Sequence, residues 1–150
     1  MIELQLKEGF IDMVSEDKLH MAALAVLAQQ GKSPDTIMTI VISDDEKLQH
    51  LNQQFLGIDQ TTDVLSFPSG DIDPDTGGKY LGDILISFPQ AQRQADAAGH
   101  SLSDELQLLV VHGCLHLLGF DHDNEDNKKI MWAAQNEILN LLGVNFELMD

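Results

Sequence analysis

The stretch HGCLHLLGFDH, residues 112–122, carries three histidines inside one apolar segment. His112 and His116 are four residues apart, so on a helix their side chains share one face, about 6 Å apart along the axis. If the helix continued, His122 would lie roughly 240° around the axis from His116 and would point elsewhere. Gly119 can adopt a positive φ, which ends a helix and turns the chain back. The spacing therefore predicts a helix that stops near Gly119, with His122 returning to meet the other two histidines.

Three imidazoles brought together in this way predict a metal centre. Neutral imidazole nitrogens bind zinc at about 2.0–2.1 Å, and three of them leave a fourth coordination position open, as in catalytic zinc sites. We expect one zinc ion on His112, His116 and His122, although the same ligands also accept other divalent transition metals. Asp121 and Asp123 flank His122 and are candidates to orient an imidazole by hydrogen bonding.

A different interpretation is that these histidines only decorate or cap a core helix, as we expect of the isolated His20, His50 and His100. The chelating spacing and the glycine at the turn favour the metal centre. The same spacing is typical of metzincin peptidases, in which the residue after the first histidine is a glutamate that acts as general base. Gly113 occupies that position here, so peptidase chemistry is disfavoured.

The sequence on either side of this segment shows strand and helix patterns without repeats or linkers. The helix that carries the histidines is unusually apolar, so it should be central to one domain spanning residues 1–150. Because residues 69–79 leave no room for a helix, the strands on either side should pair antiparallel, with Pro68 at an edge or exit. Period-two alternation and β-branched runs predict strands at 2–6, 36–43, 61–68 and 80–87. Apolar residues at 3.6-residue spacing, with start and stop signals, predict helices at 15–31, 89–98, 101–118 and 124–142, and a further helix that begins at 44.

The chain is strongly acidic, with 25 Asp and Glu residues against eight Lys and Arg residues and a formal net charge of −17. This balance repels polyanions on average, so taken alone it argues against a DNA or RNA partner. Acidity that serves only solubility is the alternative explanation. The charge therefore stands as an objection to any nucleic-acid function.

The composition otherwise indicates a globular cytoplasmic protein. Apolar residues make up 43% of the chain, no apolar run approaches the roughly 18 residues of a spanning helix, and the first residues show no signal-peptide pattern. Cys114 is the single cysteine, which excludes an internal disulfide and fits a reducing compartment. Because it falls off the ligand face of the helix, we expect it in the core. No membrane partner is expected.

The segment HGCLHLLGFDH, together with TTDVLSFP at 61–68 and LGDILIS at 81–87, resembles the YbeY family, the bacterial endoribonucleases of ribosomal RNA maturation. The order and spacing of these motifs agree over nearly the whole chain. The resemblance implies an α+β fold, with a small mixed four-stranded sheet packed against about five helices and a central helix that carries the metal ligands. It also implies a metal ion on His112, His116 and His122, and cleavage of single-stranded RNA in small-subunit (16S) rRNA maturation and ribosome quality control.

The chain departs from the family pattern at one position. Before the TDVLSFP element the family usually carries a Tyr-Arg pair whose arginine is thought to help catalysis, whereas this chain has Phe55-Leu56. An arginine stabilises charge that grows on a transferring phosphoryl group, so its absence should weaken catalysis and RNA affinity together. Arg93, the single arginine, and Lys79 are candidates to replace it; the alternative is that both are ordinary surface cations.

Asp63 in TTDV and Asp83 in LGDI are further catalytic candidates, because a carboxylate could polarise water or position a ribose hydroxyl. Both could equally hydrogen-bond the backbone at strand ends. Two other functions stay open. A ribosome-assembly or binding factor with a mainly structural metal is favoured by the net charge and by Phe55-Leu56, and a zinc hydrolase of another substrate would need only the metal centre.

Overall fold

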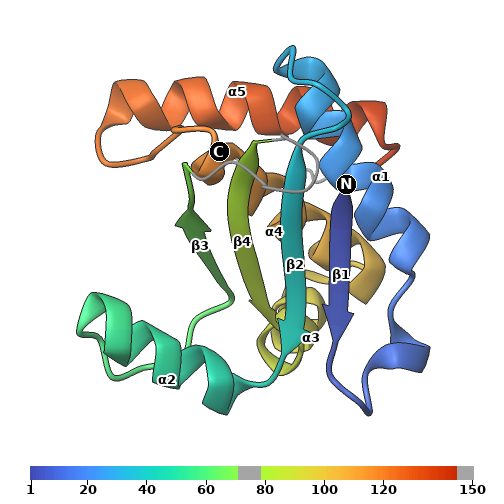
Figure 1. The fold of residues 1–150 in the computed structure, drawn as a ribbon. Helices are drawn as coiled ribbons and strands as arrows, with labels where there is room; N and C mark the ends of the chain where they lie inside the picture. Colours follow the sequence, from blue (N-terminus) through green and yellow to red (C-terminus); the bar gives the residue numbers. More distant parts are fainter. Residues whose placement is uncertain (71–78, 145–150) are drawn as a thin grey trace.

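The computed structural model describes residues 1–70 and 79–144 (Figure 1). Within these residues four strands form one mixed sheet in the order β1-β2-β4-β3. The first three strands of that order run parallel, and β3 runs antiparallel to β4 at the edge of the sheet. The strands are β1 (Ile2–Leu6), β2 (Ile37–Ser43), β3 (Val64–Pro68) and β4 (Tyr80–Ser87).

Five α-helices surround this sheet in the described part of the chain, and each begins after a polar residue whose side chain accepts a hydrogen bond from the first turn. Such N-caps satisfy backbone amides that lack a partner within the helix. A short 3-10 helix, Ile11–Met13, was not predicted. The helices are α1 (Glu16–Gln29), α2 (Asp45–Leu56), α3 (Phe88–Ala98), α4 (Leu102–Leu117) and α5 (Glu125–Leu141), with caps at Ser15, Asp44, Ser87, Ser101 and Asn124.

The predicted α+β fold, with a mixed four-stranded sheet, five helices and a central α4, is therefore confirmed. The antiparallel pairing of β3 with β4 and the edge position of Pro68 are also as predicted. The expected strand at 61–68 was too long by three residues. It begins at Val64, whose amide donates to the Asp63 carboxylate at 2.7 Å, and most of the predicted loop at 69–79 lies outside the described residues.

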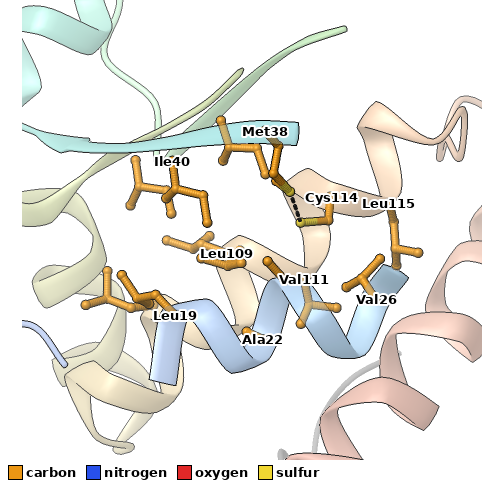
Figure 2. Close-up of a cluster of buried hydrophobic side chains, with 14 of the residues drawn as sticks. Leu19, Ala22, Val26, Met38, Ile40, Leu109, Val111, Cys114 and Leu115 are labelled. Atoms are coloured by element: carbon orange, nitrogen blue, oxygen red, sulfur yellow. Dashed lines mark hydrogen bonds between the residues drawn. The ribbon is translucent and has the colours of Figure 1, made fainter. Parts of the chain in front are cut away.

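The main core lies between one face of the sheet and helices α1 and α4, which Figure 2 shows in close-up. Met38 and Ile40 of β2 point from the sheet toward Leu109 and Cys114 of α4. The thiol of Cys114 lies 4.0 Å from the sulfur of Met38 and is fully buried, as its position off the ligand face predicted. No helix among the described residues combines the length and apolar character needed to cross a bilayer.

A second, smaller core lies on the opposite face of the sheet, under α2. Leu48 of α2 packs there against Leu65 of β3 and Leu85 of β4. Because side chains alternate along a strand, Leu85 and Asp83 share this face, whereas Ile84 points to α4. The two faces therefore separate residues that are neighbours in the sequence.

Candidate metal centre

Helix α4 lies unusually close to the sheet at Gly113. A Cβ atom added there would lie 2.9 Å from Cγ2 of Ile84 and 3.2 Å from the hydroxyl of Ser66. That hydroxyl donates to the carbonyl of Gly113 at 3.2 Å, which ties the helix to edge strand β3. The glycine between the histidines is thus explained by close packing, and a glutamate of the metzincin kind could not be accommodated without displacing Ile84 or the helix.

The turn after α4 follows the prediction made from Gly119. The helix ends at Leu117, Gly119 adopts φ of +100°, and the amide of Phe120 donates back to the carbonyl of Leu115 at 3.0 Å. The carboxylate of Asp121 accepts from the amide of His122 at 2.8 Å, which holds the returning chain. Asp121 thus stabilises the backbone at His122.

The three histidines lie together as the spacing predicted. One nitrogen from each of His112, His116 and His122 lies within 4.8 Å of the others. The Nε2 atoms of His112 and His116 are 3.1 Å apart. Two nitrogens bound tetrahedrally to zinc would be about 3.3 Å apart, given bonds of about 2.0–2.1 Å. The donor set therefore fits a single transition-metal ion, and it does not by itself select zinc.

Burial prepares two of these rings for metal binding. It lowers the pKa of His112, against the opposing effects of a hydrogen bond with Gln135 and of the charge on Asp63. Burial likewise lowers the pKa of His116, with the nearby His122 acting in the same direction. Both shifts favour the neutral imidazole, which is the form that binds a metal.

Two rings of the cluster are also held from outside it. The Nδ1 atom of His112 lies 3.0 Å from Oε1 of Gln135 on α5, and the ring of His116 forms a hydrogen bond with the Phe120 backbone. Gln135 is only 2% exposed. Sequence reasoning missed it, although a polar residue at helical spacing between the buried Met131 and Ile138 was a readable signal.

The single tryptophan lies against the same cluster. The ring centroid of Trp132 is 5.9 Å from that of His112 and 5.8 Å from that of His122. The ammonium group of Lys128 lies 5.8 Å from the Trp132 ring. Since no other tryptophan is present in the sequence, the fluorescence of Trp132 reports directly on this site.

Asp63 is the catalytic candidate that interacts electrostatically with the histidines, since its charge acts to raise the pKa of His112. Its Oδ2 accepts from the amide of Gln94 at 3.3 Å, and the same amide nitrogen donates to the buried Glu105 at 3.1 Å. Glu105 pairs with His100 at 2.6 Å. A polar network therefore runs from Asp63 into the protein, alongside its bond to the backbone at the start of β3.

The other candidates have different surroundings. Asp83 accepts a hydrogen bond from Tyr80, which in turn contacts Thr39, on the α2 face of the sheet rather than the α4 face. Arg93 pairs with Asp45 at 2.7 Å and so links α3 to α2.

Four residues singled out in the sequence lie at the surface. Lys79 is exposed directly before β4. Phe55 and Leu56, on the last turn of α2, are each 58% exposed, and the Phe55 ring lies 5.3 Å from that of Phe67. Asp123 accepts from Asn127 at 2.8 Å, so its carboxylate supports the start of α5.

The fold and the cluster define a class: a small α+β protein whose central helix and following turn present three histidines suited to one metal ion. The profile of the family described as Endoribonuclease YbeY matches residues 3–143, and the chain belongs to this family. Proteins described as Endoribonuclease YbeY from Pelotomaculum thermopropionicum and Heliobacterium modesticaldum are 41% and 42% identical to it. Their matches cover 89% and 86% of this chain and 90% and 84% of those proteins.

A solved structure has a similar fold. The solution structure of TM1509 from Thermotoga maritima is similar over 95% of this chain and 89% of that protein, with 29% sequence identity and a TM-score of 0.63. The match to the family profile and the identity with the two relatives confirm, at the level of the family, the resemblance drawn from the sequence motifs.

Proposed function

We propose that this protein is a metal-dependent endoribonuclease that cleaves single-stranded RNA in the cytoplasm, acting in 16S rRNA maturation and ribosome quality control. The observation that carries the proposal is the three-histidine cluster, with Asp63 nearby, in a chain whose relatives are described as endoribonucleases. Zinc is the proposed ion because its tetrahedral habit suits three imidazoles and one open position.

Within this proposal His112, His116 and His122 hold the ion. When bound, the metal would supply Lewis-acid chemistry at a phosphate group of the RNA. Asp63 has one oxygen engaged by the Val64 amide, and the other accepts a long bond from Gln94. We infer that the second oxygen accepts the proton of the attacking hydroxyl or water.

The net charge of −17 and the exposed Phe55-Leu56 favour a second candidate, a ribosome-assembly or binding factor in which the metal is mainly structural. Leucine offers no charge to a phosphate, and a bound divalent ion offsets at most two negative charges. A zinc hydrolase acting on another substrate is the third candidate. These candidates differ in what they cleave, so one set of assays separates them.

The test combines elemental analysis of purified protein with cleavage of single-stranded RNA, duplex RNA and casein, each before and after chelation. The variant His116→Ala should lose the metal and RNA cleavage, while His50→Ala, a matched change on the exposed face of α2, should lose neither. RNA cleavage that persists in a metal-free protein would contradict the proposal. Bound zinc without any RNA cleavage would favour the binding factor.

Two further variants address the missing arginine. Leu56→Arg places a guanidinium at the end of α2, where it should increase RNA cleavage if phosphate contact limits the rate. Arg93→Gln removes the native guanidinium but should also loosen its contact with Asp45, so its stability must be measured in parallel. Unchanged cleavage by a stable Arg93→Gln protein would remove Arg93 from the proposed site.

A further inference from the structure

We propose that Gln135 is a positioning residue that fixes the tautomer of His112 and so selects Nε2 as the atom offered to the metal. The inference rests on the metal centre of the proposed function. It concerns α5, a helix that contributes no histidine to the cluster.

The geometry of the hydrogen bond leads to this assignment. Oε1 of Gln135 lies 3.0 Å from Nδ1 of His112, and an amide oxygen can only accept. Nδ1 must therefore carry the proton. A neutral imidazole has one N–H, so Nε2 is left with a free lone pair. That lone pair lies on the side of His116, whose Nε2 is 3.1 Å away.

Because Gln135 is buried, the orientation of its side-chain amide determines which nitrogen of His112 carries the proton. Gln135 is 2% exposed and lies on the buried face of α5 with Met131 and Ile138. Removing an amide from water costs free energy unless it finds a partner, so the His112 bond offsets a cost that a leucine would not incur. If the amide were rotated, its NH₂ group would donate to Nδ1 and the ring proton would move to Nε2. That arrangement would block the ligand atom, so the two orientations predict opposite metal affinities.

A ligand held in this way needs no reorientation before it binds. In metal sites the acceptor on the second histidine nitrogen fixes the ring and raises its basicity, and losing it typically costs 10–100-fold in metal affinity. His116 interacts with the backbone of Phe120 instead. Gln135 differs because it is a side chain, which can be changed without altering the turn.

The experiment compares Gln135→Met, which keeps the length but removes the acceptor, with Gln135→Glu, which keeps an acceptor oxygen. Gln107→Met is the matched control, because Gln107 is a second glutamine with 5% exposure, located on α4. Zinc affinity is measured by competition with a chelator, using the fluorescence of Trp132 as the signal. The His112 tautomer is read from ¹⁵N chemical shifts of the metal-free protein.

We expect Gln135→Met to bind zinc 10–100-fold more weakly than wild type, while Gln135→Glu and Gln107→Met stay within a few-fold of it. The wild-type ring should carry its proton on Nδ1, and Gln135→Met should gain the Nε2–H form. Denaturant melts of the metal-free variants identify any loss of affinity that comes from unfolding.

Equal zinc affinity of a folded Gln135→Met protein, or an Nε2–H tautomer in wild type, would overturn the inference. If Gln135→Met does not fold, the wild-type tautomer and the affinity of Gln135→Glu still decide it. A wild-type protein without zinc affinity would overturn the metal centre itself, which separates failure of the proposed function from failure of the role of Gln135.

Discussion

Replacing Gly113 by alanine tests whether this glycine exists for the close approach of α4 to the sheet. The new Cβ would lie 2.9 Å from Cγ2 of Ile84, whereas carbon atoms rest at about 3.5–4.0 Å. Ile84 is fully buried, so it or the helix must move by roughly 0.6–1 Å in a close-packed core. Overpacking of this kind costs about 1–3 kcal/mol, and the higher helix propensity of alanine offsets up to about 1 kcal/mol.

We therefore expect Gly113→Ala to lower the free energy of unfolding by up to about 2 kcal/mol in urea melts. The same change made in an Ile84→Ala protein should instead raise it by up to about 1 kcal/mol, because Cγ2 and Cδ1 of Ile84, which would lie 2.9 and 3.2 Å from the added Cβ, are then absent. The coupling between the two changes should thus be about 1–3 kcal/mol. Where the helix rather than Ile84 moves, the neighbouring His112 moves with it, and metal affinity should fall in Gly113→Ala as well.

The double-mutant cycle tests whether Gly113 is needed because α4 approaches Ile84 closely. If Gly113→Ala changes the free energy of unfolding equally, within about 0.5 kcal/mol, in the otherwise unchanged protein and in Ile84→Ala, then contact with Ile84 does not explain the glycine. A stabilising effect of Gly113→Ala in the otherwise unchanged protein would refute the reasoning directly.

Three further outcomes follow from the structure. Burial lowers the pKa of His112 and of His116 below 6.5, so in acid the unfolded chain binds more protons than the folded protein does. The free energy of unfolding of the metal-free protein, measured in denaturant melts, should therefore fall from pH 7 to pH 5. Cys114 is fully buried, and burial raises the pKa of its thiol. Thiol reagents should therefore modify Cys114 only as fast as the protein opens. Rapid modification under native conditions would contradict its position in the core. Asp44→Ala removes the N-cap of α2, because the Asp44 carboxylate accepts a hydrogen bond from the backbone amide of Lys47 at 2.8 Å. This change should lower the free energy of unfolding by about 0.5–2 kcal/mol in thermal or urea melts. An unchanged unfolding midpoint would contradict this role of Asp44.

Much of the site could be derived from the sequence because its geometry is local. A four-residue separation on a helix brings His112 and His116 onto one face, and the positive φ of Gly119 returns His122 within one turn. The elements were also readable, since periodicity and N-cap residues act over a few neighbours. The strand at 61–68 was predicted too long by three residues, because its ladder with β4 begins only at Val64, opposite Ile86.

The sequence by itself determined the elements, the clustering of the three histidines and the family to which the chain belongs. Only the tertiary structure decided which candidates share a face, since it brings Asp63 near His112 and leaves Asp83 with Tyr80 on the other side of the sheet. It also brought Gln135 to a ring 23 residues away along the chain. Local backbone preferences extend over a turn or two, whereas contacts between elements depend on how their apolar faces pack, and single-sequence patterns do not specify that packing.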